Sequence, residues 1–264
     1  MENFKFKKSF GQNFLQDKNI VKNIVDKTKI EDNSLVIEVG PGSGALTKEL
    51  SKVAKQVLSY EIDTRLEETL DDNLKEFNNI TIIYDDFLNR DINSDIVNYD
   101  VDNVYFVANI PYYITTPIIE KLIESKIDFK AITMMVQKEV ADRFGAKVKT
   151  KSYSSITVFL NYYFDIEKLM FVSRNAFIPK PNVDSEVIGL RKKESMRKAN
   201  NEELFFKIVR DSFRFKRKNI RNNLKNYDLK IVLEVLSKYG KDLTARAEEL
   251  DLDVFIDLAD RLNK

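Results

Sequence analysis

The chain contains no cysteine, no histidine and no tryptophan among its 264 residues. These absences exclude disulfides, thiolate nucleophiles, zinc sites built from Cys and His, and acid–base catalysis by imidazole. Any chemistry must therefore use carboxylates, amides, hydroxyls, backbone groups or a bound cofactor. We expect no metal site.

Long hydrophobic runs are also missing. No apolar stretch approaches the roughly 20 residues that a membrane-spanning helix needs. The first 14 residues mix Lys5, Lys7 and Lys8 with polar groups, unlike a secretory signal. We therefore expect a cytoplasmic protein. No long apolar stripe calls for a partner subunit, so we expect a monomer.

Charge is nearly balanced overall but unevenly distributed. The formal net charge is only +1, whereas nucleic-acid-binding proteins usually carry a basic surface. From Arg191 to Lys230, however, 14 Lys and Arg stand against 5 Asp and Glu, and residues 1–30 have 7 against 3. These two basic regions predict a locally positive face, although solvated helix surfaces in a lysine-rich chain are the alternative interpretation.

The pattern from Leu35 onward is typical of an α/β sheet with crossover helices, because short apolar runs alternate with turns and helical spacing. The expected strands are Leu35–Val39, Val57–Tyr60, Ile80–Tyr84, Val104–Ala108, Ile132–Val136, Leu169–Ser173 and Val183–Leu190. The expected helices are Ala45–Ala54, Arg65–Phe77 and Pro117–Glu124, with an earlier helix capped by Asp17. The last two strands could form an antiparallel pair at the sheet edge.

The strand pattern ends near Arg191 in a charged run, and only helical spacing follows. One apolar stripe contains Leu204, Phe205, Ile208, Val209 and Phe213, and another begins at Ile231. We therefore expect a sheet domain over residues 1–190 and a small all-helical domain over residues 191–264.

A glycine-rich turn follows the first expected strand. Gly40, Gly42 and Gly44 would let the backbone approach a ligand closely at a helix N-terminus. The turn also satisfies the fingerprint of dinucleotide-binding proteins. Glu61, followed by Ile62, ends the second strand. There its carboxylate could accept hydrogen bonds from the ribose hydroxyls of a nicotinamide dinucleotide or of a methyl donor that contains a nucleoside.

Two acidic residues favour a cationic methyl donor over a dinucleotide. Glu38 directly precedes the glycines, where its charge would oppose a pyrophosphate but suit a cationic amino-acid group. Asp86 follows the third strand and could accept from an adenine amine, beside Phe87, whose ring could cover the base. Together with Gly40 and Glu61 they predict a nucleoside site at the carboxyl edge of the sheet.

The segment after the fourth strand carries the most specific chemistry. An exocyclic adenine amine is a poor nucleophile because its lone pair is delocalised into the ring. The Asn109 side-chain oxygen and the Ile110 carbonyl could accept from the amine hydrogens and favour the form that attacks a methyl group. Tyr112 could stack on the base, and Pro111 would stiffen the segment. An ordinary proline turn is the alternative.

These motifs resemble the ribosomal RNA adenine N6,N6-dimethyltransferases of the small subunit, the kasugamycin-sensitivity type. The resemblance covers nearly the whole chain and includes residues 10–15, 109–117, 135–141, 177–185 and 215–224. It implies a Rossmann-like, seven-stranded sheet of S-adenosylmethionine-dependent methyltransferases with a helical C-terminal domain. It also implies dimethylation of two adjacent adenosines in the 3′-terminal hairpin loop of 16S ribosomal RNA during small-subunit assembly.

The resemblance assigns roles to further residues. Asn13 and Leu15 would contact the donor, and Phe177 would flank the target base opposite Tyr112. Residues 215–224 are similar to the family's basic C-terminal helix. Crowding of cations into about three helical turns would position RNA phosphates without reading bases. The expected RNA-binding residues are Arg214, Lys216, Arg217, Lys218 and Arg221.

Three other functions stay open. The 23S ribosomal RNA adenine methyltransferases of macrolide resistance share the cofactor and catalytic motifs, although the long tail from Arg191 favours the 16S enzyme. A non-catalytic assembly factor would not need Glu61, Asp86 and Asn109 together. A nicotinamide dehydrogenase would need an acid for hydride transfer, which we do not find. The chain departs from the family pattern at residues 147–155, which leaves that loop's conformation open.

Overall fold

The computed structural model describes residues 14–15, 17–110 and 114–263. Its packing divides the chain into two compact units. The sheet unit comprises residues 1–141 and 167–192, and the helical unit comprises residues 142–166 and 193–264. Residues 142–166 thus group with the C-terminal helices, whereas the sequence places the domain boundary at residue 191 alone.

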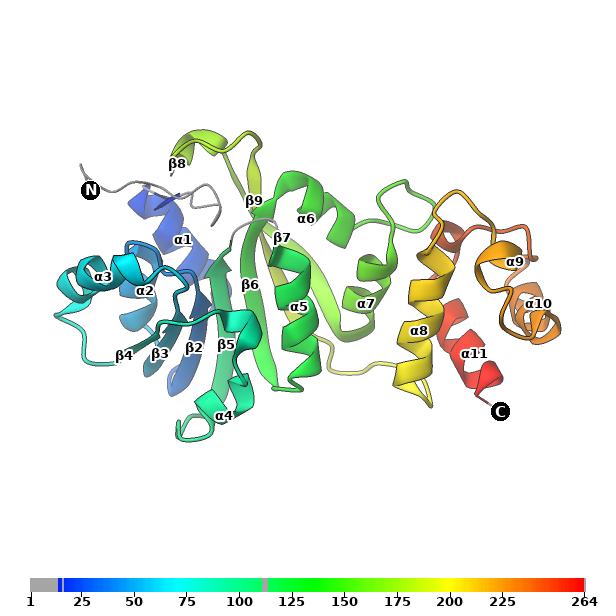
Figure 1. Ribbon diagram of the computed structural model, residues 1–264, viewed down its shortest axis with the longest axis horizontal. Helices are drawn as coiled ribbons and strands as arrows, with labels where there is room; N and C mark the ends of the chain where they lie inside the picture. Colours follow the sequence, from blue (N-terminus) through cyan, green and yellow to red (C-terminus); the bar gives the residue numbers. More distant parts are fainter. Residues whose placement is uncertain (1–13, 16, 111–113, 264) are drawn as a thin grey trace. The chain divides into compact units, whose positions relative to one another are not determined.

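The sheet unit contains a seven-stranded sheet, among the described residues, in the order β4-β3-β2-β5-β6-β9-β7 (Figure 1). β2 pairs in parallel with β3 and β5, and the parallel pairing extends to β4 and β6. β9 runs antiparallel to β6, and β7 lies beyond it at the edge. The strands are β2 (Ser34–Val39), β3 (Gln56–Tyr60), β4 (Ile80–Ile83), β5 (Asn103–Asn109), β6 (Phe129–Gln137), β7 (Phe164–Val172) and β9 (Ser185–Lys192).

All seven expected strands are confirmed, with ends shifted by a few residues. β2 is buried along its whole length, as a central parallel strand covered on both faces should be. A separate two-stranded sheet pairs β1 (Phe14–Leu15) with β8 (Phe177–Ile178). The sequence did not predict this pair, because two-residue strands far apart in the chain leave no periodic pattern.

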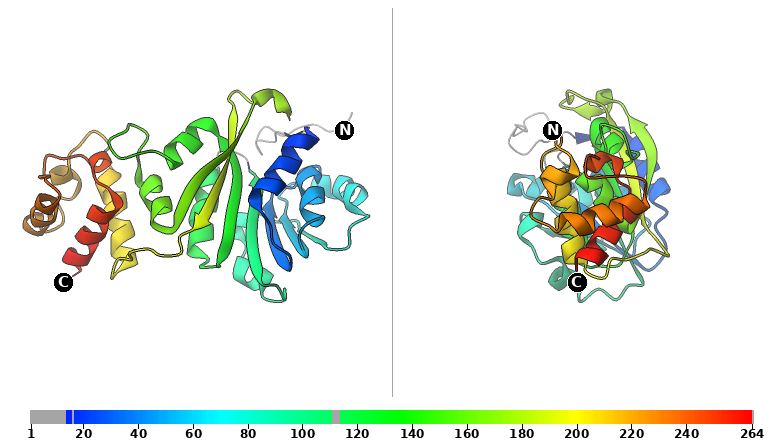
Figure 2. Two further views of the ribbon diagram at one scale, coloured as in Figure 1. Left: turned by 180° about the vertical axis from the view of Figure 1, so that it is seen from behind. Right: turned by 90° about the vertical axis from the view of Figure 1, so that its right-hand side faces the viewer.

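Helices cover both faces of the sheet. α1 and α2 pack against one face through a cluster that includes Val21, Leu46, Val57 and Met135. The other face carries a row of aromatic rings in which Phe106 lies 6.0 Å from Phe87 between ring centroids. Figure 1 shows α5 before the centre of the sheet, and the view from behind in Figure 2 brings α1 forward. These helices are α1 (Lys18–Thr28), α2 (Ala45–Ser51), α3 (Glu67–Leu74), α4 (Ile92–Ile96) and α5 (Thr115–Glu124).

The start of α1 confirms the expected cap. The Asp17 carboxylate accepts from the backbone N–H of Asn19 at 2.9 Å and from that of Ile20 at 3.4 Å. An aspartate at this position satisfies N–H groups that the helix leaves without partners. Val21, Ile24 and Val25 then face the core, as their spacing indicates.

The helical unit is built around aromatic side chains. The Tyr162 ring stacks on Phe205 with centroids 4.5 Å apart, and the Phe206 ring lies 5.0 Å from Phe159. The Tyr162 hydroxyl accepts from the Ala199 N–H and donates to the Glu202 carboxylate, each at 3.0 Å. Its helices are α7 (Ser155–Tyr163), α8 (Glu202–Phe213), α9 (Ile220–Asn223), α10 (Leu229–Lys238) and α11 (Leu252–Leu262), while α6 (Lys138–Phe144) spans the boundary at residue 141.

Candidate active site

The glycine-rich turn between β2 and α2 lies beside the carboxyl end of β5. Gly40 has a φ of +73°, and a Cβ atom built there would lie 3.9 Å from the Asn109 carbonyl oxygen. Gly44 has a φ of +81°, and its Cβ would meet the Leu74 side chain at 3.1 Å. Glycine tolerates this backbone conformation without steric cost. The turn therefore brings the backbone near Gly40 against the segment expected to carry catalysis.

Glu61 ties the glycine turn to the end of β3. Its carboxylate accepts from the Gly42 N–H at 3.2 Å and from the Asp63 N–H at 2.8 Å. The side chain is almost buried, and this burial raises the pKa of Glu61, while the two backbone N–H groups oppose the rise. Each carboxylate oxygen can accept more than one hydrogen bond, so both keep capacity for a ligand. Ile62, the next residue, is 48% exposed.

Glu38 lies within β2 and is only 1% exposed. One carboxylate oxygen accepts from the Ser59 hydroxyl at 2.7 Å. The other, Oε1, makes no hydrogen bond of normal geometry among the described residues, although the Thr47 hydroxyl lies close enough to lower the pKa of Glu38. Burial raises the pKa of Glu38 to about 7, against the opposing effect of Ser59 and Thr47, and the negative charge of Glu61 raises it further.

These carboxylates fit a cationic ligand. A buried oxygen without a partner and a second buried carboxylate nearby both gain from a positive charge, because opposite charges attract strongly where water is excluded. A pyrophosphate would be repelled by the same pair. The arrangement therefore fits S-adenosylmethionine better than a dinucleotide. The described residues contain no group of three or more acidic side chains placed to hold a metal ion.

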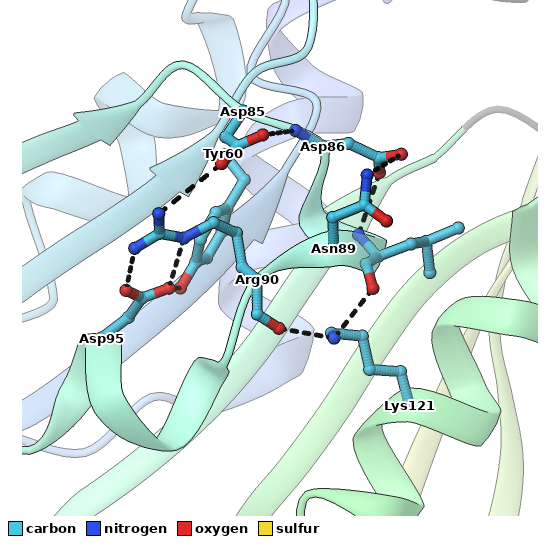
Figure 3. A network of polar contacts seen from close by, with 8 residues as sticks. Tyr60, Asp85, Asp86, Asn89, Arg90, Asp95 and Lys121 are labelled. Atoms are coloured by element: carbon cyan, nitrogen blue, oxygen red, sulfur yellow. Dashed lines mark hydrogen bonds and ion pairs between the residues drawn. The ribbon is translucent and has the colours of Figure 1, made fainter.

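Asp86 begins a 3-10 turn over Phe87–Asn89 after β4. Its carboxylate accepts from the Leu88 N–H at 2.9 Å and from the Asn89 side-chain amide at 3.4 Å. The Asp85 carboxylate in turn accepts from the Asp86 N–H at 2.7 Å. These bonds hold the carboxylate of Asp86 in one place (Figure 3).

Arg90 and Lys121 also hold the Asp86 turn in place through polar contacts. The Arg90 guanidinium makes two contacts with the Asp95 carboxylate and lies 3.5 Å from that of Asp85. Tyr60, at the end of β3, donates to Asp95 at 2.9 Å. The Lys121 ammonium on α5 donates to the carbonyls of Leu88 at 3.0 Å and Arg90 at 2.6 Å. Figure 3 shows this network joining β3, the Asp86 turn and α5.

The structure describes only part of the expected catalytic segment. Asn109 is the last residue of β5, half-buried, and pairs with Met135 of β6. Ile110 is 2% exposed. Pro111, Tyr112 and the expected donor contact Asn13 lie outside the described residues.

Two aromatic side chains with expected roles in the site are almost fully buried. Phe87 is 3% exposed and packs edge-on against Tyr60, with centroids 5.1 Å apart, so its ring is covered in this conformation and its expected contact with a bound adenine stays a prediction. Phe177 is 2% exposed and pairs with Leu15 across the β1–β8 ladder. It packs in the hydrophobic core with Leu15 and Met135, so its ring is covered in this conformation, and its expected place beside the target base stays a prediction.

The basic C-terminal residues are exposed but do not form one helix. α8 ends at Phe213 and α9 begins at Ile220, so residues 214–219 form a turn between them. The expectation of a continuous basic helix is therefore wrong. All five expected RNA-binding residues are exposed: Arg214, Lys216, Arg217, Lys218 and Arg221.

Sequence reasoning missed the network around Arg90. Arg90 and Asp95 are five residues apart, which is not a helical pair spacing, and Tyr60 and Lys121 come from distant elements. Only the Asp91 cap of α4, with its carboxylate accepting from the Asn93 N–H at 3.1 Å, left a recognisable local pattern.

The strand order and the acidic site define the class of protein. Dinucleotide-binding folds have a mostly parallel sheet with the strand order 3-2-1-4-5-6, whereas here antiparallel β9 is inserted between β6 and β7. This is the Rossmann-like sheet of methyltransferases. The sequence model of the family described as "Ribosomal RNA adenine dimethylase" matches residues 3–264. The chain belongs to this family.

Relatives with similar sequences share one description. The chain is 45% identical to the "Ribosomal RNA small subunit methyltransferase A" of Anoxybacillus flavithermus, over 98% of this chain and 91% of the relative. It is also 45% identical to the protein of that name from Clostridium botulinum, over 97% of this chain and 94% of the relative.

Two solved structures are similar along most of the chain. A dimethyladenosine transferase from Plasmodium falciparum has a TM-score of 0.77 and 29% identity, covering 93% of this chain and 95% of that one. The 23S rRNA methyltransferase ErmE has a TM-score of 0.73 and 30% identity, covering 96% of this chain and 100% of that one. The ErmE match spans the helical unit as well. The length of the tail after Arg191 therefore does not distinguish methyltransferases of 16S RNA from those of 23S RNA.

No helix in the described part of the chain is long and apolar enough to span a membrane.

Proposed function

We propose that this protein transfers methyl groups from S-adenosylmethionine to the N6 amines of two adjacent adenosines in the 3′-terminal hairpin loop of 16S ribosomal RNA. The observation that carries the proposal is the near full-length similarity, at 45% identity, to relatives named small-subunit methyltransferases. Identity to the 23S enzyme ErmE is 30%. The buried acidic site supports the choice of a cationic donor.

The donor would lie at the carboxyl edge of β2, β3 and β4. When bound, it supplies a methyl group on a positively charged sulfur. Glu61 would accept from the ribose hydroxyls with the capacity that Gly42 and Asp63 leave, and Asp86 would accept from the adenine amine. Ile62 offers an exposed apolar contact. Asn13, Leu15, Gly40 and Asn109 complete the proposed donor site, and Phe87 would join it only after a movement that exposes its ring.

Asn109 and Ile110 would prepare the target amine. The Asn109 side-chain oxygen and the Ile110 carbonyl would accept from the two amine hydrogens and favour the pyramidal form, whose lone pair is free to attack. Such preorganised partners lower a barrier because they need no rearrangement during the reaction. Pro111 and Tyr112 would hold the base. Phe177 would take part only after a movement that exposes its ring.

The finer biological setting belongs to the same proposal. The substrate would be an immature small ribosomal subunit in the cytoplasm, met by a monomeric enzyme. Residues 1–190 would carry catalysis and residues 191–264 would bind RNA. The exposed cations Arg214, Lys216, Arg217, Lys218 and Arg221 would contact phosphates.

The test uses small subunits that lack adenine dimethylation. They are incubated with the protein and isotopically labelled donor, and the 16S RNA is then analysed by mass spectrometry. We expect label in two adjacent dimethyladenosines near the 3′ end. Label found only in 23S RNA offered in parallel would favour the ErmE-like function instead. Donor binding without label in any RNA would refute the proposed activity.

Asn109→Ala separates chemistry from binding in this assay. We expect methyl transfer to fall by about 100-fold or more, as for loss of other preorganised polar groups, while donor affinity measured by calorimetry changes little. Asn103→Ala, at the opposite end of β5, is the matched control and should retain activity. An Asn109→Ala protein that binds the donor poorly but reacts normally would contradict the assigned role.

A further inference from the structure

The connection between α8 and α9 combines cationic and aromatic side chains. Residues 214–218, here called the basic turn, consist of four cations and one phenylalanine: Arg214, Phe215, Lys216, Arg217 and Lys218. Phe215 is 56% exposed. The Arg214 guanidinium carbon lies 5.5 Å from the centre of its ring. A large aromatic side chain left in water amid positive charge favours a partner that is both planar and anionic.

Hydrogen bonds from Asn223 give the basic turn a defined backbone. The Asn223 side-chain oxygen accepts from the Phe215 N–H at 3.3 Å. Its amide nitrogen donates to the carbonyls of Ser212 at 2.6 Å, Phe215 at 3.3 Å and Lys218 at 3.4 Å. The Lys218 N–H also donates to the Phe215 carbonyl at 2.8 Å. The ring is therefore presented on a closed turn, which lowers the ordering cost of binding.

The charges of the basic turn are not neutralised within the described residues. None of its four cations forms an ion pair there. Lys216 donates to a backbone carbonyl, that of Lys151, at 2.6 Å, and this contact leaves its charge uncompensated. Arg221, one helical turn further on, is also exposed. Cations thus precede and follow Phe215 along the chain, where they could contact the phosphate groups on either side of a bound base.

We infer that Phe215 is a stacking site for one unpaired nucleobase of RNA, with the flanking cations holding the adjoining phosphates. This inference rests on the proposed function and extends it from phosphate contacts to a base contact. Single-stranded nucleic acids are commonly bound by cationic surfaces with aromatic rings on which bases stack, at about 1–3 kcal/mol per base. A paired base keeps its stacking neighbours inside the helix and gains nothing from the ring.

The test compares a short uridine-rich single-stranded RNA carrying one 2-aminopurine, whose neighbours stack on it only weakly, with a fully paired duplex of the same length. We expect the protein to quench 2-aminopurine in the single strand. Phe215→Ala should weaken single-strand binding by about 5- to 150-fold and leave duplex binding unchanged. Phe215→Trp should restore both affinity and quenching. Phe171→Ala, which removes a phenylalanine that is 54% exposed on β7, is the matched control and should bind like the unchanged protein.

Salt dependence distinguishes stacking from charge. Loss of Phe215 should leave the slope of log affinity against log salt unchanged, because no counterion release is lost. Lys218→Ala should reduce the slope by about 0.7. Several results would overturn the inference: equal losses on single strand and duplex, no loss on either RNA, or no quenching by the unchanged protein. Unchanged affinity of Phe215→Ala for both RNAs would also be expected if the ring contacts a ribosomal protein instead.

The methylation assay above separates this inference from the proposed function. If the unchanged protein methylates subunits and the Phe215→Ala variant has the same RNA affinity as the unchanged protein, only the stacking site is refuted. If stacking depends on Phe215 but no RNA becomes methylated, only the proposed activity fails.

Discussion

Glu38 is a buried acid whose ionisation opposes folding. Its pKa rises to about 7 because the surrounding core does not solvate the carboxylate. In the unfolded chain the same group ionises near its ordinary value of 4.5. Between these two values the folded state binds more protons than the unfolded state, so the contribution of Glu38 to stability becomes less favourable as the pH rises.

Glu38→Gln should therefore stabilise the protein against unfolding in a pH-dependent way. A shift of this size corresponds to about 3 kcal/mol at pH 8 and to less than about 1 kcal/mol at pH 5. Urea unfolding without added donor, at both pH values, measures the difference. Donor affinity should fall, because the negative charge facing a cation is removed.

The control for this prediction is Glu68→Gln, which alters an exposed glutamate on α3. It should show no such growth of the stability difference with pH. A Glu38→Gln difference that is equal at pH 5 and pH 8 would mean that Glu38 does not titrate in this range.

The positions of these acids could be expected from the sequence, but their surroundings could not. Glu38, Glu61 and Asp86 end or follow successive parallel strands, and the carboxyl ends of such strands meet at one edge. The burial of Phe87 and Phe177 depends on packing between distant elements, which a local pattern does not contain. The local sequence around an aromatic residue near a site is the same whether its ring faces a ligand or the core.

At the scale of elements, the Asp86 turn depends on α5. Lys121 donates to two carbonyls of this turn, and its ammonium lies 5.8 Å from the centre of the Phe87 ring. α5 begins at Thr115, shortly after the proposed catalytic segment. The donor-side turn and the helix that follows the catalytic segment thus share one cation.

Lys121→Met should weaken donor binding without slowing the reaction at saturation. Methionine keeps the apolar stem but loses both hydrogen bonds, so Asp86 is held less firmly. Hydrogen bonds from charged groups contribute about 1.5–3 kcal/mol, and transfer of part of this to donor affinity would raise the KM for donor by about tenfold. Steady-state kinetics with varied donor would show kcat within about twofold of the unchanged protein.

Lys130→Met, at the exposed start of β6, removes only a surface ion pair with Glu31 at 3.4 Å. It should leave both kinetic constants unchanged. A fall in kcat with a constant KM in Lys121→Met would contradict the positioning role and place the effect on the catalytic segment.

Strands were easier to predict than the basic turn for a physical reason. The central strands are continuous apolar runs because both faces are covered. Residues 214–219 contain no glycine or proline, so nothing in their composition ends a helix. The helix ends there because Asn223 binds the turn's backbone groups and because Asn219 caps α9, accepting from the Asn222 N–H at 3.2 Å. These side-chain bonds compete with helix continuation only in the folded context.

At the scale of the whole molecule, a net charge of +1 conceals the region that matters for RNA. Residues 191–230 hold 14 Lys and Arg against 5 Asp and Glu. Elsewhere in the helical unit, cations are matched by acids, as where Arg261 pairs with Glu234. Since affinity for RNA follows the phosphates actually neutralised, local rather than net charge should govern subunit binding.

The double substitution Arg217→Glu/Arg221→Glu tests this distinction. It should weaken binding to small subunits and flatten its salt dependence, because at least two phosphate contacts, each contributing about 0.7–0.9 to the slope, are lost. Lys230→Glu/Lys238→Glu on α10 changes the net charge by the same amount and serves as the control. Binding measured over a range of salt concentrations should separate the two proteins clearly. If both lose affinity equally, the long-range field of the molecule governs binding, and the exposed cations around the basic turn have no special role.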